Sequence, residues 1–175
     1  MKKRVLFWGM AIGLIAAGAA YGDDLSIHFN MLSDTGQGKE IGVVQVSDSP
    51  YGLILTPRLV GLAPGLHGFH VHQQPDCGTA VKDGKPVPGL AAGGHYDPQK
   101  TGKHEGPYGQ GHLGDLPALY VGPDGRTSHP ILAPRLKVSD LKGRSVIIHA
   151  GGDNYADLPE PLGGGGARVA CGVVK

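Results

Sequence analysis

Short apolar runs separated by glycine and proline are the feature that most constrains the fold of this 175-residue chain. Its 31 glycines and 14 prolines make up about a quarter of the residues, a share at the edge of the low-complexity range. Apolar and polar side chains alternate over residues 25–31, which is typical of a half-buried strand. Further strand candidates, rich in β-branched residues, are 41–46, 51–55, 68–72, 119–121, 145–149 and 168–174. Strands this short predict an antiparallel sandwich or barrel.

The remaining composition indicates one soluble-type domain and excludes one class of partner. Hydrophobic residues make up 40% of the chain, enough for a substantial core. Charged residues make up only 18% and the net charge is +1, so the chain lacks the basic surface of a nucleic-acid binder. We find no internal repeat and no interdomain linker, and residues 137–142 are expected to form a single helical turn.

The first 22 residues have the layout of a secretory signal. Lys2, Lys3 and Arg4 precede an apolar run over 5–20, which small residues follow. The run is shorter than the ~20 residues that a membrane-spanning helix needs. We therefore predict a signal peptide over 1–22 and an exported domain over 23–175 that does not contact a membrane after signal removal. Export implies an oxidising compartment, in which cysteines form disulfides.

One long segment does not follow the strand pattern. Residues 76–116 show little apolar periodicity and contain many glycines and four prolines. A structureless loop of ~40 residues is uncommon inside a compact domain unless something other than the core orders it. Cys77 and a series of histidines are the candidates for that role, so we expect the function to lie here.

The histidines form a candidate metal-binding set. His70 and His72 are two residues apart on a predicted strand and therefore share one face. The long segment and a later strand add further candidates: His95, His104, His112, Asp115 and His149. Seven ligands exceed the needs of one tetrahedral site, whereas two ions sharing one imidazole would use them all. Imidazole suits copper and zinc, and a carboxylate suits zinc. The alternative is that each histidine is an ordinary polar residue, as we expect for His28, His67 and His129.

Four motifs carry a family resemblance. Residues 68–72 (GFHVH), 93–98 (GGHYDP), 111–117 (GHLGDLP) and 164–172 (GGGARVACG) resemble the copper/zinc superoxide dismutases, in that family's order. The resemblance implies an all-β fold, a Greek-key antiparallel β-sandwich or barrel of the immunoglobulin-like kind, with long metal-binding and active-site loops. It also implies an enzyme that converts two superoxide anions and two protons to dioxygen and hydrogen peroxide. Copper would undergo the redox cycle, and zinc would be structural.

The resemblance also assigns a role to each candidate residue. With one copper and one zinc per chain, it implies four copper ligands: His70, His72, His95 and His149. It implies four zinc ligands, of which the first bridges to copper: His95, His104, His112 and Asp115. Arg168 would attract superoxide, and His95 would take part in catalysis. Asp153 would hydrogen-bond His70 and His104, and Cys77 would pair with Cys171.

The short spacing between His72 and Cys77 looks like the bacterial periplasmic branch of the family. We therefore expect a periplasmic location. The family suggests a homodimer, but the subunit contacts of the eukaryotic dimers cannot be transferred to this chain. A periplasmic copper or zinc carrier without turnover is the alternative function, because it would use the same ligands.

Overall fold

The first described strand follows the predicted alternation. The computed structural model describes residues 25–175, and its first strand, β1 (Leu25–Ser33), buries Ile27 and Phe29 while the alternating Ser26 and His28 are exposed. One face of β1 therefore contributes to a core. The signal peptide predicted over 1–22 lies outside the described residues.

The other six predicted strands are confirmed, with bounds that differ from the expected ones by a residue at some ends and by more where the strands extend further. They are β2 (Gly36–Ser49), β3 (Gly52–Val60), β5 (Phe69–His72), β8 (Leu119–Val121), β11 (Arg144–His149) and β12 (Arg168–Val174). Five strands of two or three residues were not predicted, because alternation cannot be recognised over so few positions: β4 (Gly65–His67), β6 (Ala80–Lys82), β7 (Lys85–Val87), β9 (Arg126–Thr127) and β10 (Ile131–Ala133).

Helical structure is confined to single turns. The turn expected over 137–142 is present as α1 (Val138–Leu141), and two 3₁₀ turns follow other loops, η1 (Leu90–Ala92) and η2 (Pro161–Gly164). Within residues 25–175, none of the helices has the length and apolar character needed to cross a membrane.

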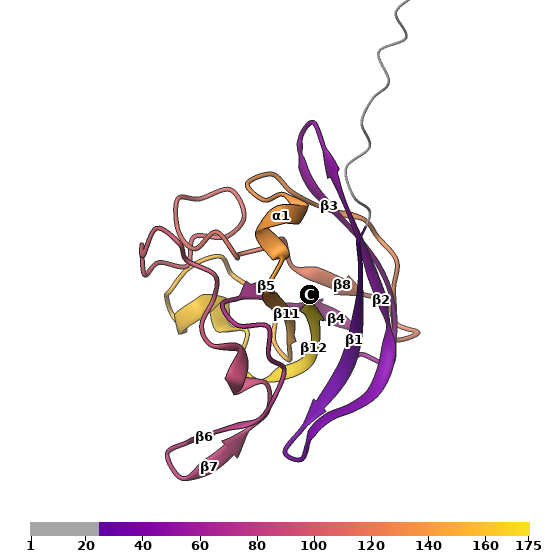
Figure 1. Ribbon diagram of the computed structural model, residues 1–175, viewed down its shortest axis with the longest axis vertical. Coiled ribbons are helices and arrows are strands. Elements are labelled where there is room, and N and C mark those ends of the chain that lie inside the picture. Colours follow the sequence, from indigo (N-terminus) through magenta and orange to yellow (C-terminus); the bar gives the residue numbers. More distant parts are fainter. Residues whose placement is uncertain (1–24) are drawn as a thin grey trace, which may run out of the picture.

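Eight of the described strands form one curled antiparallel sheet. Its order is β10-β3-β2-β1-β12-β11-β5, with β9 added beside β3, while β4 pairs with β8 and β6 with β7. In Figure 1, β1 to β3 form one wall on the right, and β5, β11 and the long loops lie to their left. The last strand, β12, therefore lies between the first strand and β11. The all-β barrel or sandwich expected from the sequence is confirmed.

The strands β5 and β11 are buried along almost their whole length. Phe69 and Val71 of β5 and Val146 and Ile148 of β11 belong to the main hydrophobic core. Their neighbours along each strand face the other way, toward the long loops. Both faces of this part of the sheet are thus covered, one by the core and one by the loops.

The segment 76–116 is not structureless throughout. It contains the β6–β7 hairpin, which projects from the lower part of Figure 1, followed by η1. Asp83 and Gly84 link the two strands with φ angles of 53° and 74°. An Asp-Gly pair with both φ positive is typical of a two-residue hairpin turn. The prediction of an irregular loop is therefore wrong for residues 80–87, where this Asp-Gly pair indicates a hairpin.

Candidate metal centre

Two of the predicted ligands lie on the outer face of β5. Because Phe69 and Val71 belong to the core, His70 and His72 project from the opposite face of the strand. Both histidines are fully buried, with no solvent-exposed surface. Side chains that are polar, paired on one face and shielded from water require partners from another part of the chain.

The long loop supplies these partners by lying along β5. His70 forms a backbone bridge with Asp115, and His72 forms one with His95. Two ligands from the strand and two from the loop are thereby brought side by side, although 23 to 45 positions separate the strand ligands from the loop ligands in the sequence.

Backbone hydrogen bonds fix this arrangement at Val71. Its N–H donates to the carbonyl of Gly114 at 2.9 Å, and its carbonyl accepts from the N–H of Tyr96 at 2.8 Å. A side chain at position 114 would be impossible here, since a Cβ on Gly114 would lie 2.3 Å from the Val71 oxygen. The glycine therefore permits the loop to approach the strand.

All seven side chains predicted as metal ligands meet in one pocket. The rings of His70 and His95 stack with centroids 4.0 Å apart, and those of His70 and His149 lie 4.9 Å apart. None of the seven is more than 8% exposed. They are His70, His72, His95, His104, His112, Asp115 and His149.

The potential ligand atoms divide into two groups. Within each group, one atom from every residue lies within 4.8 Å of the others. The first group contains His70, His72, His95 and His149, and the second contains His70, His95, His104 and Asp115. Since the two groups share members, two ions held by them would be neighbours.

His112 lies beside the second group without being part of it. Its Nδ1 atom is 3.4 Å from Oδ1 of Asp115, and its ring centroid is 5.3 Å from that of His95. His70 cannot serve both groups, because its Nε2 atom already contacts Asp153 at 2.7 Å and leaves one nitrogen free. If that nitrogen serves the first group, the second is one donor short, and His112 is placed beside Asp115 to supply it.

The pocket contains an unusual concentration of polar atoms without partners. Buried polar atoms are nearly always hydrogen-bonded, and an unpaired one is costly. Three such atoms, His70 Nδ1, His72 Nε2 and His149 Nε2, have no partner in this pocket. Three more, His104 Nδ1, His112 Nδ1 and Asp115 Oδ2, lack a well-aligned hydrogen bond, although His104 Nδ1 lies 3.0 Å from Asp115 Oδ2 and His112 Nδ1 lies 3.4 Å from Asp115 Oδ1. Bound cations would satisfy all of them at once. Five imidazole nitrogens and one carboxylate oxygen fit copper and zinc.

Hydrogen bonds at the second ring nitrogen set the tautomers. His72 donates from Nδ1 to the carbonyl of Gly93 at 3.0 Å, and His149 donates from Nδ1 to the carbonyl of Gly166 at 3.1 Å. A carbonyl can only accept, so both rings carry their proton on Nδ1 and keep the lone pair on Nε2. Metal-binding histidines are commonly oriented in this way.

Asp153 joins the two groups. Its Oδ2 accepts from Nε2 of His70 at 2.7 Å, and its Oδ1 accepts from Nε2 of His104 at 2.8 Å. Burial alone would raise the pKa of Asp153, but the bonds from His104 and His70 outweigh it and hold the pKa well below its usual range. Gly163 packs directly against this carboxylate, because a Cβ there would lie 2.1 Å from Oδ1.

The histidines differ in protonation according to their neighbours. Burial, reinforced by the nearby His95, lowers the pKa of His70 to about 3, and burial lowers that of His149 to about 4. For His104, burial is outweighed by Asp115 and Asp153, and the pKa rises to about 9. In the absence of metal, the imidazoles of the first group are therefore neutral at pH 7, while His104 is protonated on both nitrogens and positively charged.

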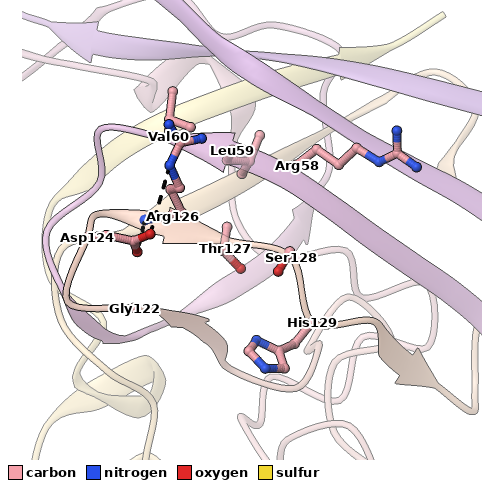
Figure 2. A pocket seen from close by; sticks show the side chains of 9 residues that line it. All are labelled: Arg58, Leu59, Val60, Gly122, Asp124, Arg126, Thr127, Ser128 and His129. Atoms are coloured by element: carbon pink, nitrogen blue, oxygen red, sulfur yellow. Dashed lines mark hydrogen bonds and ion pairs between the residues drawn. The ribbon is translucent and has the colours of Figure 1, made fainter.

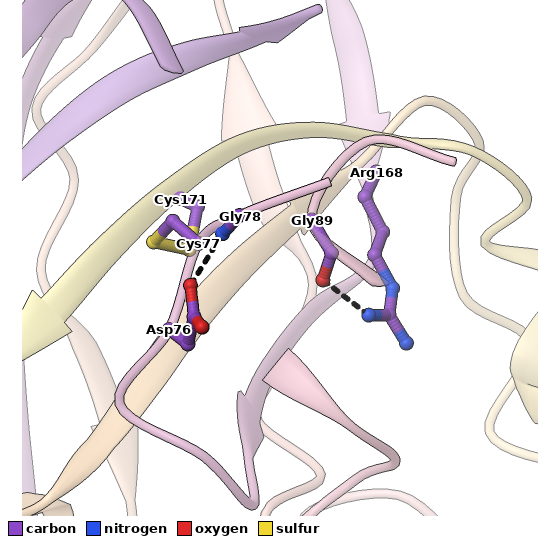
Figure 3. Close-up of a disulfide and its surroundings, with 6 residues drawn as sticks. All are labelled: Asp76, Cys77, Gly78, Gly89, Arg168 and Cys171. Atoms are coloured by element: carbon purple, nitrogen blue, oxygen red, sulfur yellow. Dashed lines mark hydrogen bonds between the residues drawn. A yellow bond between two sulfur atoms is a disulfide. The ribbon is translucent and has the colours of Figure 1, made fainter. Parts of the chain in front are cut away.

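Arg168 lies next to the first group at the start of β12. It pairs with His149 across the β11–β12 ladder. Its guanidinium donates to the carbonyls of Gly89 and Gly93, the latter at 2.7 Å. Figure 3 shows the bond to Gly89. The half-buried cation is thus aimed by two backbone oxygens of the long loop.

The predicted disulfide between Cys77 and Cys171 is confirmed. The two Cα atoms are 5.8 Å apart and both residues are buried. The bond attaches the beginning of the long loop to β12, three positions from Arg168 (Figure 3). Ala92 and Ile147 pack around it in a small second core.

Asp157 contributes to the site but was not predicted. Its carboxylate accepts from the backbone N–H of His104 at 2.9 Å and from that of Leu162 at 3.2 Å. It therefore connects the loop that carries His104 to the loop before β12. In the sequence this aspartate stands among turn-forming residues, so the pattern indicates only a turn.

The histidines expected to be ordinary polar residues lie outside both groups. His28 pairs with Glu40, and His67 contacts the carbonyls of Ala63 and His149. His129 lines a separate hollow between β3 and β9, together with Arg58 and Arg126 (Figure 2). That hollow contains none of the predicted metal ligands.

Comparison with known proteins agrees with this geometry. The sequence model described as copper/zinc superoxide dismutase (SODC) matches residues 40–174. The chain is 57% identical over 168 residues to superoxide dismutase [Cu-Zn] 1 of Salmonella typhimurium, with 95% of each chain covered. The solved Cu/Zn superoxide dismutase from Brucella abortus is 52% identical, with a TM-score of 0.86 over 87% of this chain and all of that one. A structure of the monomeric Cu,Zn enzyme from Salmonella enterica is also 52% identical, with a TM-score of 0.79 and the same coverage.

These relatives are enzymes, and the match extends through the pocket and the fold that builds it. The reaction is therefore the conversion of superoxide to dioxygen and hydrogen peroxide, with copper and zinc as cofactors. A carrier without turnover, the alternative considered for the sequence, is set aside. The chain belongs to the bacterial copper/zinc superoxide dismutases.

Proposed function

We propose that the two groups of side chains divide the two metals between them. Copper is assigned to His70, His72, His95 and His149, and zinc to His95, His104, His112 and Asp115. The observation that supports this assignment is the set of six polar atoms that are buried in one pocket without a well-aligned hydrogen bond. His95 is the shared ligand, because it belongs to both groups and its Nδ1 lies 2.9 Å from Asp115.

The division follows the chemistry of the donors. Copper, when bound, supplies the one-electron exchange with superoxide, whereas zinc has no redox chemistry. The first group offers only imidazole, which suits copper in either oxidation state, and the second adds the carboxylate of Asp115. With Nδ1 of His95 on the Asp115 side, its Nε2 atom faces the copper group and is the atom that would hold a proton for the product.

Arg168 is assigned to the attraction and orientation of the superoxide anion. Its guanidinium is half-buried, lies beside the copper group and donates to two carbonyls, without a carboxylate partner among the described residues. Its positive charge is therefore not neutralised by an ion pair. A local positive charge can raise the encounter rate of an anion even where the whole molecule has little net charge.

Asp153 is assigned to the orientation of one ligand from each metal. By accepting from His70 and His104 it fixes which nitrogen of each ring faces the pocket. Partners of this kind raise ligand basicity and hold the ring in place.

Metal analysis of matched variants tests the assignment. We expect wild-type protein to hold one copper and one zinc per chain. His149→Gln should lower copper content and leave zinc, whereas His112→Gln should lower zinc and leave copper. His129→Gln, at an exposed histidine outside the pocket, should change neither. Loss of the same metal from both pocket variants would contradict the division.

We propose that residues 1–22 direct export and that residues 23–175 form the periplasmic enzyme. Support comes from the charged and apolar layout of the first 22 residues, from the disulfide and from the bacterial relatives. Expression of the full chain followed by fractionation and N-terminal sequencing tests this. We expect activity in the periplasmic fraction and a new N-terminus near residue 23. An uncleaved cytoplasmic product would contradict it.

A second chain is not needed to complete the site. All seven proposed ligands and Arg168 belong to one chain, and the similar Salmonella enterica structure is of a monomeric enzyme. A homodimer stays a prediction for this chain. Sedimentation at several protein concentrations, combined with activity measurements, distinguishes the two states: activity per chain should be the same in both.

A further inference from the structure

Arg135 lies on the barrel beside residues 104–112, the part of the long loop that carries His104 and His112. It follows β10, and its neighbours Ala133 and Leu136 are buried in the main core with exposures of 2% and 1%. A hydrogen bond from the N–H of Leu136 to the carbonyl of Ala133 closes the turn between them. The backbone at Arg135 is therefore fixed to the barrel, while its side chain extends toward the loop.

The guanidinium of Arg135 binds four backbone carbonyls of that loop. Nε donates to Pro107 and Nη1 to Gly111, both at 3.1 Å. Nη2 donates to Gly106 at 3.2 Å and also to His112. Three of these acceptors lie between His104 and His112, the two histidines proposed for zinc alone, and the fourth is the carbonyl of His112 itself.

These carbonyls have few other ways to be satisfied. Residues 106–111 form neither helix nor strand, and Gly106, Pro107, Gly111 and His112 are all buried. An unpaired buried carbonyl costs free energy comparable to a lost hydrogen bond. Among residues 25–175, Arg135 forms no ion pair with a carboxylate, so the loop carbonyls are what balance its charge.

The copper group is built differently. Three of its four proposed ligands are held by the strand ladder, His70 and His72 in β5 and His149 in β11, while the shared ligand His95 lies on the long loop outside residues 104–112. None of them contacts Arg135. The spacing of these three copper ligands thus depends on the sheet, whereas the spacing of His104 and His112 depends on the loop.

We infer that Arg135 is a positioning residue for zinc: it gathers the four carbonyls, fixes His112 relative to His104, and so sets zinc affinity separately from copper affinity. The inference rests on the proposed division of the metals. The planar guanidinium is essential to it, because a lysine ammonium carries the same charge but cannot reach four carbonyls arranged around a fork.

The test uses two variants and one control. Arg135→Lys keeps the charge, and Arg135→Met keeps much of the apolar stem. Arg126→Met removes a similar cation that, within the part of the chain the structure describes, pairs only with the exposed Asp124 at 3.8 Å. Zinc affinity is measured by competition with a chromophoric chelator, copper affinity by a parallel competition, and ligand geometry by the visible spectrum of cobalt(II) bound in place of zinc.

We expect both Arg135 variants to lower zinc affinity by about 10- to 100-fold, the usual effect of removing a residue that orients metal ligands. Copper affinity should stay within about twofold, the cobalt(II) bands should shift or weaken, and Arg126→Met should match the wild type.

Unchanged zinc affinity would overturn the inference. Equal losses of zinc and copper would overturn it too, because they would make Arg135 a general fold residue. Full rescue by lysine would show that charge and not the fork matters. If the wild type itself fails to bind zinc at His104 and His112, the proposed division of the metals fails instead.

Discussion

The ring of His72 and the guanidinium of Arg168 donate to the same backbone oxygen, that of Gly93, at 3.0 and 2.7 Å. The two residues come from β5 and β12, which are not neighbours in the sheet. The carbonyl therefore couples the direction of a proposed copper ligand to that of the cation proposed to attract the substrate. Displacement of the loop at Gly93 would disturb both.

Replacement of Arg168 should separate attraction from metal binding. We expect Arg168→Met to lower kcat/KM by about tenfold or more at low salt and to weaken its dependence on ionic strength, because a local positive charge is lost. Arg168→Lys should retain much of the salt dependence with a smaller rate, since the ammonium cannot donate to both Gly89 and Gly93. Pulse radiolysis at several salt concentrations, with metal content as the control, measures this. Unchanged kinetics would remove Arg168 from the mechanism.

Asp153→Asn should loosen both metals with little effect on the barrel. An amide presents only one oxygen, and its NH₂ group would face the N–H of His70 or His104. We expect metal affinity to fall by about 10- to 100-fold, the range found for such partners. Chelator competition measures the loss, and Asp124→Asn, at an exposed aspartate, is the control. Wild-type affinity in Asp153→Asn would show that the two bonds do not orient the ligands.

A comparison of Gly163 with Gly84 separates the steric effect of an added Cβ from the conformational cost of a positive φ angle. Gly163 and Gly84 both have φ of 74°, but a Cβ on Gly163 would collide with Asp153 whereas one on Gly84 would meet nothing within 4 Å. Gly84→Ala should therefore cost only the conformational penalty, about 1 kcal/mol. Gly163→Ala should lose more stability and also lower metal affinity. Thermal unfolding and chelator competition on the two variants test this, and equal behaviour would contradict it.

The two metals should differ in the protons that they displace. The pKa of His104 is raised to about 9, so this ring carries a proton at pH 7 that zinc must displace, and zinc affinity should rise with pH until about 9. The pKa values of His70 and His149 are lowered to about 3 and about 4, so these copper ligands are already neutral. With each metal added alone to metal-free protein, calorimetry in buffers of different ionisation enthalpy should show about one more proton released by zinc. Equal release would contradict the assignment.

Reduction of the disulfide should free the loop before it damages the barrel. The bond closes 94 positions, which corresponds to at most about 5 kcal/mol in the loop-entropy treatment. Compared with the wild type, the variant with Cys77→Ser and Cys171→Ser should show a larger increase in hydrogen-exchange rate around Gly89 and Gly93 than in β1 and β2. Copper-site geometry should change as well, because Arg168 and His72 share the Gly93 carbonyl. Equal protection in both proteins would argue against this.

The sequence predicted the site best where short local patterns determine which way a side chain points or which family the chain resembles. The alternation in β5 was enough to place His70 and His72 on a common face, and four motifs were enough to indicate the family and the pairing of Cys77 with Cys171. Each of these signals is local or depends on residue types that rarely occur together by chance.

What could not be predicted depends on contacts between distant backbone atoms. Arg135 and Asp157 act on carbonyls and N–H groups, which every residue possesses, so no pattern of side chains reveals their partners. The short strands β9 and β10 are similarly defined by pairing with β3. The hairpin turn at Asp83 and Gly84 is different, because its signal was present and only its interpretation was wrong.

The loop that supplies His95 and Asp115 also covers the outer edge of β5, the last strand in the sheet order. Any event that lifts this loop would leave the N–H and carbonyl of Val71 without their partners and expose an unpaired strand edge. Such edges are templates for pairing with other chains. The residues that gather the cofactors thus also protect the molecule against self-association, and aggregation should follow demetallation more closely than it follows loss of the barrel.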